Sequence, residues 1–281
     1  MALSPVLIQL YWQLWCTMPV TYETLLIDRP AEHCLRVTLN RPEVANAFNT
    51  QMARDLVAVF EELATEPQAA RVVILTGSGE RAFCAGGDLK ERDGMTDAAW
   101  TAQHLVYERM VRAVLGCPVP IIGAINGAAY GGGTELVAAL DFVYAAEHAR
   151  FAQTEVRIGI IPGAGGTQTL ARAVGERRAK EIILTGAPFT AEEAVVWGLV
   201  NEVHAPAELM PAVLKTASRI AANAPIATRQ AKLAIHRGLQ MGLSDGLSFE
   251  IEAYNRTIPT KDRREGVRAF NEKRAPVFKG K

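Results

Sequence analysis

Short apolar runs alternate with stretches of helical periodicity from residue 22 onward. Residues 22–27 and 34–39 have the composition of strands, and we expect a turn between them at residues 29–30. Residues 51–63 place apolar side chains at helical spacing, which predicts an amphipathic helix. The almost wholly apolar run 71–76 predicts a strand that is buried on both faces.

The same alternation continues through the middle of the chain and then stops. A loop at 83–88 leads to a predicted helix at 98–115, which Pro118 and Pro120 end before a strand. This order is typical of stacked β/β/α units rather than of the uniform βαβ alternation of a nucleotide-binding sheet. After about residue 165 strand signals become sparse, so we expect an α/β fold whose C-terminal part is all-helical. The helices predicted there are 167–184, 191–197, 207–222, 226–239 and 247–257.

The N-terminal residues 1–17 are apolar and carry no charged side chain. They lack the basic region and the small-residue cleavage site of a secretory signal, and they are too short for a membrane span. We therefore expect a poorly ordered extension at 1–17, a core with the active site at 18–204 and a helical region at 205–281, with no membrane partner.

Composition limits the classes of function. Of 281 residues 49% are hydrophobic, and 30 Lys and Arg balance 30 Asp and Glu, which argues against disorder and against a nucleic-acid partner. The four cysteines lie far apart without a Cys-x-x-Cys pair, so we expect reduced thiols in a cytoplasmic protein and no metal site. Residues 257–281 nevertheless hold eight basic against three acidic side chains. This positive end would suit an anionic ligand, although a solvated surface is the alternative.

Two glycine clusters, at 131–133 and 163–166, each precede a predicted helix. Neither has the Lys-Ser/Thr of a P-loop or the spacing G-x-G-x-x-G of a dinucleotide site. The free N–H groups at a helix N-terminus can hold an anion or a developing oxyanion. The loop at 83–88 also follows a strand, and two such loops could each donate one N–H to an oxyanion hole. Glycines that serve only helix–strand packing remain the alternative.

Two glutamates lie close to these loops. Glu135 falls in the first turn of the helix after 131–133, and Glu155 follows 20 residues later, ahead of the second cluster. Two carboxylates that face one cavity can orient a water molecule and divide the acid and base roles. From the residues alone, Glu135 could instead stabilise the helix dipole, and Glu155 could pair with Arg157 at a strand end. None of the five histidines lies in a motif, so we assign none to catalysis.

Five motifs, in order and with matching spacing, resemble those of the crotonase (enoyl-CoA hydratase/isomerase) superfamily. The resemblance covers residues 20–281, and its last motif is most similar to the branch that contains methylglutaconyl-CoA hydratases. The motifs are AFCAGGDLKE at 82–91, INGAAYGGGTEL at 125–136, TEVRIGIIPGAGGTQTLARAVG at 154–175, LTGAPFTAEEAVVWGLVNEV at 184–203 and TKDRREGVRAFNEKRAPVFKGK at 260–281.

The resemblance implies a spiral of stacked β/β/α units with a C-terminal helical oligomerisation region, in a homotrimer or a dimer of trimers. It implies hydration of a 2-enoyl-CoA in fatty acid metabolism, in the cytoplasm or, in a eukaryote, in the mitochondrial matrix. Glu135 and Glu155 match the catalytic glutamates, and Gly87 and Gly132 match the oxyanion-hole donors. Coenzyme A is part of the substrate, and no metal or other cofactor is implied. The implied substrate-binding residues are Ala85, Gly87, Asp88, Leu89, Lys90 and Gly132.

Two alternatives remain open. Within the same fold, the chain could be an enoyl-CoA isomerase, a lyase or another acyl-CoA enzyme. From another class, it could be an RNA-binding or scaffold protein, although basic clusters such as 177–180 are weak. The acyl group is also open; we expect residues 94–115 and 134–142 to line its pocket.

Overall fold

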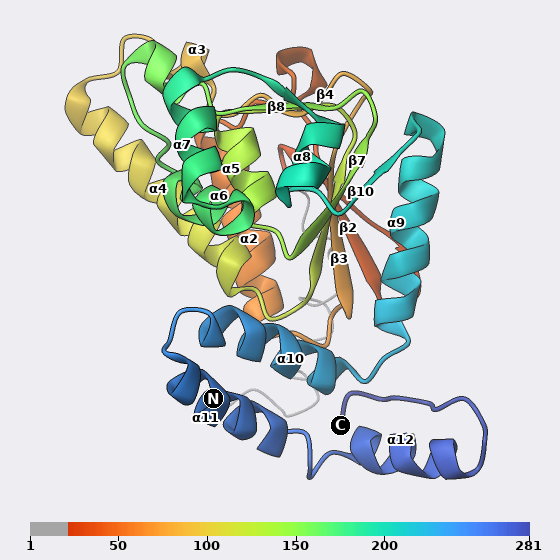
Figure 1. Ribbon diagram of the computed structural model, residues 1–281. Helices are drawn as coiled ribbons and strands as arrows, with labels where there is room; N and C mark the ends of the chain where they lie inside the picture. Colours follow the sequence, from red (N-terminus) through yellow and green to blue (C-terminus); the bar gives the residue numbers. More distant parts are fainter. Residues whose placement is uncertain (1–21) are drawn as a thin grey trace, which may run out of the picture.

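The computed structural model describes residues 22–281, and the expected extension at 1–17 lies outside the described residues. The chain forms two sheets, which helices surround (Figure 1). The larger sheet has six strands in the order β1-β2-β3-β5-β7-β10 and is parallel except for the β1–β2 pair. Its strands are β1 (Leu25–Ala31), β2 (Cys34–Leu39), β3 (Val72–Gly77), β5 (Ile121–Ile125), β7 (Phe142–Ala146) and β10 (Glu202–His204).

The smaller sheet has the order β4-β6-β8-β9. Its strands are β4 (Ala82–Cys84), β6 (Ala128–Tyr130), β8 (Arg150–Ala152) and β9 (Phe189–Thr190). The chain repeatedly adds one strand to the large sheet, one to the small sheet and then helix, in the units that start at β3, β5 and β7. The predicted spiral of β/β/α units is therefore confirmed.

Helices follow these strand pairs and cover the sheets. Between residues 22 and 200 the helices are α2 (Thr50–Thr65), α3 (Leu89–Arg92), α4 (Asp97–Gly116), α5 (Gly132–Ala138), α6 (Gly166–Val174), α7 (Glu176–Thr185) and α8 (Ala191–Trp197). Two 3-10 turns, η1 (Pro42–Val44) and η2 (Glu155–Ile158), lie in the same range. The predicted helix 51–63 is found as α2, and the Asn49 side chain caps it by accepting from the N–H of Met52. A cluster of fully buried side chains joins α2 and α4 to both sheets, and Phe60, Phe83 and Met110 lie in it. The loops that carry the site therefore rest on a well-packed core.

The first hairpin differs from the prediction. The turn lies at Glu32 and His33 rather than at residues 29–30, and β1 continues through Pro30 to Ala31. Proline is tolerated there because β1 is an edge strand and the pairing with β2 shifts register between Asp28 and Ala31. His33 makes the turn with a φ of 59°.

The predicted helix at 167–184 is wrong as a single element. It is divided into α6 and α7 at Gly175, whose φ of 79° a helix cannot continue. The region after residue 165 is also not all-helical, because β9 pairs with β8 and β10 pairs with β7. These strands have only two and three residues, too few to show a period of two in the sequence.

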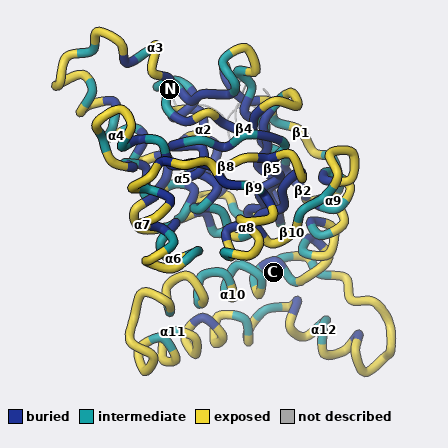
Figure 2. Tube along the Cα trace, turned by 45° about the horizontal axis from the view of Figure 1, so that its top comes forward, coloured by how far each residue is buried: buried dark blue, intermediate teal, exposed yellow. Residues whose placement is uncertain are grey.

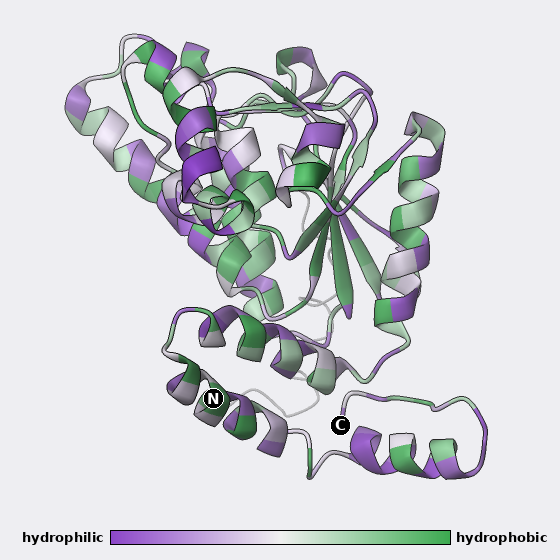
Figure 3. Ribbon diagram, in the orientation of Figure 1, coloured by the Kyte–Doolittle hydropathy of each residue, from purple (hydrophilic) through white to green (hydrophobic). Residues whose placement is uncertain are grey.

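From residue 206 onward the regular elements are helices: α9 (Pro206–Ala221), α10 (Pro225–Gly238), α11 (Leu243–Asn255) and α12 (Lys261–Asn271). The spacing of apolar residues did not predict α12, because this helix is strongly polar. α9 packs on the large sheet through Leu209, Val213 and Ala217. By contrast, α10, α11 and α12 lie beside the body of the molecule (Figure 1). Most residues of α11 and α12 are exposed, whereas most of those of α10 are half-buried (Figure 2). Several of these exposed residues are apolar (Figure 3).

No helix within residues 22–281 is long and apolar enough to cross a membrane.

Candidate active site

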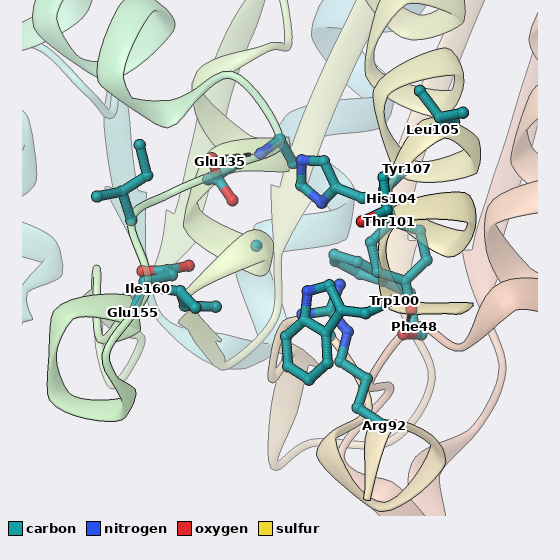
Figure 4. A pocket seen from close by; sticks show the side chains of 15 residues that line it. Phe48, Arg92, Trp100, Thr101, His104, Leu105, Tyr107, Glu135, Glu155 and Ile160 are labelled. Carbon is teal, nitrogen blue, oxygen red and sulfur yellow. Dashed lines mark hydrogen bonds between the residues drawn. The ribbon is translucent and has the colours of Figure 1, made fainter. Parts of the chain in front are cut away.

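A cavity of about 500 Å³ opens where the small sheet, α4 and the two glycine loops meet (Figure 4). It brings together four of the predicted site residues, Gly87, Gly132, Glu135 and Glu155. Its other lining residues are Phe48, Arg92, Trp100, Thr101, His104, Leu105, Tyr107, Ile160, Ile161, Gly163 and Ala164. The lining is largely apolar, with few polar groups, which is the usual character of a small-molecule site.

The loop at 83–88 and the glycine loop at 131–133 touch each other beside this cavity. A Cβ at Gly133 would overlap the Cys84 carbonyl, and a Cβ at Gly86 would lie 3.0 Å from the Gly132 nitrogen. At Gly132 a Cβ would overlap the ring of Phe48. Side chains at these positions would therefore push the loops apart.

The N–H groups of Gly87 and Gly132 are available beside this cavity. Neither donates to a protein acceptor within residues 22–281. The neighbouring amides are engaged: the N–H of Asp88 donates to the Phe48 carbonyl, and that of Gly131 donates to Ala152. Gly132 is the first residue of α5, so its N–H also lies at the positive end of a helix.

Glu135, in the first turn of α5, is 3% exposed and holds the second glycine loop. Its Oε1 accepts from the N–H groups of Ala164 at 2.8 Å and Gly166 at 2.7 Å (Figure 4 shows the first). A Cβ at Gly166 would come within 2.8 Å of this carboxylate, so glycine is required for the approach. Burial raises the pKa of Glu135 to about 7, the two N–H donors oppose the rise, and the charge of Glu155 adds to it.

Glu155 begins the 3-10 turn η2 after β8 and is 8% exposed. Its Oε1 lies against Gly131, where a Cβ would be 2.9 Å away, and its Oε2 is buried without a partner in the described part of the chain. Burial raises the pKa of Glu155 as well. The predicted alternative, an ion pair with Arg157, is absent from residues 22–281. Two protonatable carboxyl groups thus face one cavity beside two free N–H donors.

The other predicted substrate-binding residues lie outside the lining of this cavity. Ala85, Leu89 and Lys90 are exposed. Asp88 is buried, and its carboxylate caps α3 and pairs with Arg41 at 2.9 Å. Burial alone would raise the pKa of Asp88, but Arg41 and the backbone N–H groups of α3 lower it overall. Its position therefore indicates a structural role for this side chain.

Several lining residues were not predicted individually. Phe48, ahead of α2, and Arg92, at the end of α3, had no motif that pointed to the cavity. The expected segment 94–115 does supply side chains of α4, among them Trp100 and His104, whereas 134–142 supplies only Glu135. Within residues 22–281 no cluster of His, Cys, Asp and Glu could hold a metal ion.

Stacked β/β/α units around a cavity with two buried glutamates match the expected crotonase fold. The sequence model of the enoyl-CoA hydratase/isomerase family matches residues 31–281, so the chain belongs to that family.

Solved structures and curated relatives agree with this assignment. An enoyl-CoA hydratase from Bacillus anthracis has a TM-score of 0.90 and 45% identity, covering 92% of this chain and 100% of that one. YngF of Bacillus subtilis (strain 168) is 48% identical over 258 residues, which cover 92% of this chain and 99% of YngF. A short-chain-enoyl-CoA hydratase of Clostridium acetobutylicum is 40% identical over 238 residues, 85% of this chain and 91% of that protein. Membership of the methylglutaconyl-CoA hydratase branch stays a prediction.

Proposed function

We propose that this protein hydrates 2-enoyl-CoA thioesters to 3-hydroxyacyl-CoA by syn addition of water. The observation that carries the proposal is the pair of buried carboxyl groups, Glu135 and Glu155, in one cavity with the free N–H groups of Gly87 and Gly132. Relatives named short-chain-enoyl-CoA hydratase and crotonyl-CoA hydratase support it.

In this proposal the Gly87 and Gly132 amides hold the thioester oxygen. Water between the two carboxylates adds its oxygen to C3 while Glu135, as base, takes a proton. The electrons of the double bond move to the thioester oxygen, and the two amides stabilise the resulting enolate. One such donor is worth roughly 3–4 kcal/mol in other enzymes. Glu155 then gives a proton to C2.

The proton balance requires one carboxyl group to be protonated while the other is ionised. Burial raises the pKa of both glutamates, and the charge of Glu155 raises that of Glu135 further, so ionisation of one group disfavours ionisation of the other and a pair with one proton is favoured. The two groups exchange their roles in the reverse reaction. The addition changes no oxidation state overall, so the proposal requires no redox cofactor and no metal.

The direct test follows crotonyl-CoA in D₂O. A hydratase removes the absorbance of the conjugated enoyl thioester and gives 3-hydroxybutyryl-CoA with one deuterium at C2. An isomerase, a lyase or a thioesterase would not give this product, so its absence would favour the alternative acyl-CoA reactions of the family. A Gly132→Pro variant would not isolate the amide, because added atoms at Gly132 would overlap Phe48.

The proposal includes a homotrimer or a dimer of trimers that associates through the C-terminal helices. Large apolar side chains are exposed there, such as Leu239, Leu243 and Phe270 at 79%, 80% and 83%. Such a surface is typical of contacts between subunits. Light scattering during gel filtration measures the mass, and a monomer of 30.4 kDa would contradict this part of the proposal.

A further inference from the structure

A buried arginine lines the catalytic cavity. Arg92, the last residue of α3, is 8% exposed, and its side chain extends toward the cavity (Figure 4). It lies beside the oxyanion loop, because a Cβ on Gly87 would be 3.6 Å from Arg92 Nη1. An acyl chain whose thioester oxygen sat at the Gly87 amide would therefore pass close to this guanidinium.

Neighbouring side chains fix the guanidinium but leave its outer N–H groups free. The Trp100 ring lies 4.3 Å from Arg92 Cζ and the Tyr107 ring lies 5.0 Å from it. Arg92 Nε donates to Gln103 Oε1 at 2.8 Å. Neither Nη1 nor Nη2 donates a hydrogen bond within the part of the chain that the structure describes. Aromatic packing of this kind holds the planar group in place for a bidentate ligand.

Arg92 has no direct carboxylate partner in the described part of the chain. It takes part in no ion pair within residues 22–281, and residues 1–21 contain no Asp or Glu. Glu91 instead accepts from the N–H of Thr50 and from Gln103 Nε2. A buried charge without a partner is costly, so such a group in a ligand cavity indicates a ligand of opposite charge.

We infer that the site selects 2-enoyl-CoA thioesters whose acyl chain carries a carboxylate beyond the double bond, and that Arg92 binds this carboxylate through Nη1 and Nη2. The inference rests on the proposed function for the orientation of the thioester. An unsubstituted acyl chain would leave the guanidinium without a counter-charge, whereas a carboxylate matches its geometry and charge.

A binding experiment tests the inference without turnover. Butyryl-CoA and glutaryl-CoA are both saturated and differ only by the terminal carboxylate, so calorimetry gives the ratio of their Kd values. We expect glutaryl-CoA to bind about 10- to 100-fold more tightly to the unaltered protein. The ratio should fall to about one in Arg92→Gln and recover in part in Arg92→Lys, which keeps the charge but loses the bidentate geometry.

Arg178→Gln is the matched control. Arg178, on α7, also packs on a tryptophan, 4.3 Å from the Trp197 ring, but it pairs with Glu181 and lies outside the cavity. Its loss should leave the ratio of Kd values unchanged. Equal affinities in the unaltered protein, or an equal weakening of both ligands by Arg92→Gln, would overturn the inference and leave Arg92 a structural role.

Turnover separates the inference from the proposed function. Glutaconyl-CoA is crotonyl-CoA with a terminal carboxylate, and we expect it to have the larger kcat/KM by a similar factor. Hydration of crotonyl-CoA with no preference for either carboxylated ligand would overturn the inference and leave the proposed function standing. Preference for glutaryl-CoA in binding, without hydration of either enoyl thioester, would support the carboxylate site and contradict the hydratase.

Discussion

The carboxylates of the cavity and those of the C-terminal helix α12 lie in opposite electrostatic settings. Glu135 receives only neutral backbone N–H donors, and burial raises its pKa to about 7. Glu265 lies between Arg268 and Arg274, and these two side chains hold its pKa well below its usual range. The first setting gives a group that can exchange protons near neutral pH, whereas the second gives a fixed charge that ties α12 to the chain end. A shifted pKa thus points to a catalytic role only when its physical cause is known, because ion pairs outside any active site also shift pKa values.

The largest effect is expected when the carboxylates of the cavity are replaced. Glu135→Gln and Glu155→Gln keep the size of the side chain but cannot accept or give the reacting proton. Each should lower kcat for crotonyl-CoA by roughly 10²- to 10⁴-fold. Steady-state kinetics with the purified variants measures this loss, and calorimetry with butyryl-CoA checks that the thioester still binds.

Glu265→Gln is the control for these variants because it also removes one carboxylate charge, but on α12. It should leave kcat unchanged. If Glu155→Gln kept full turnover, Glu155 would have no part in the mechanism. If all three variants lost activity alike, the loss would come from net charge or folding.

A smaller effect is expected from pH. The proposed addition needs one carboxyl group of the pair ionised and the other protonated, so kcat/KM should be greatest when the pair holds one proton. Glu135, whose pKa of about 7 is raised in part by the charge of Glu155, loses that last proton above pH 7. Raising the pH one unit above this pKa leaves the pair with one proton in about a tenth of the molecules, so a fall of about tenfold is expected. A profile that stays flat from pH 7 to pH 9 would contradict the shared use of the two carboxyl groups.

How far the sequence predicts the site depends on whether a residue belongs to a local motif. Glu135 and Gly132 share one short motif with the helix start, and their places follow from local structure. Phe48 reaches the cavity through a contact with Gly132, 84 positions away in the chain, which no local pattern records. Arg92 lies only five residues after Gly87, but the sequence does not show that its side chain is buried in the cavity.

Features that the sequence did not predict have the same cause. Asp88 was predicted to bind substrate, and this stays a prediction; the pairing of its carboxylate with Arg41, which is 47 positions away in the chain, was not foreseen. β9 and β10 also escaped prediction, because they are strands only through their pairing with β8 and β7. The alternating pattern did predict the stacked units, since each apolar run is buried by the repeat itself.

The buried carboxyl group of Glu135 should also make the fold less stable at high pH. The folded-state pKa of Glu135 lies above its ordinary value of 4.5, so its stabilising contribution is complete below that value and is lost as pH rises through about 7. The full shift corresponds to about 3 kcal/mol. Glu135→Gln should therefore unfold at higher denaturant concentration than the unaltered protein at pH 8.5. At pH 5 the two should unfold alike, and a variant that is less stable at both pH values would contradict this assignment.

The smallest effect is expected in α12, where the sign is reversed. Because its two arginines lower the folded-state pKa of Glu265, its contribution is present above the ordinary value of 4.5 and is lost as pH falls below it. Glu265→Gln should lower Tm slightly at pH 7, and the difference from the unaltered protein should shrink as the pH is lowered below 4.5. Differential scanning fluorimetry across this range measures the difference. A difference in Tm that grew on acidification would show that the ion pairs of Glu265 with Arg268 and Arg274 do not stabilise the contact between α12 and the chain end. The opposite electrostatic settings of Glu135 and Glu265 would then not be reflected in stability.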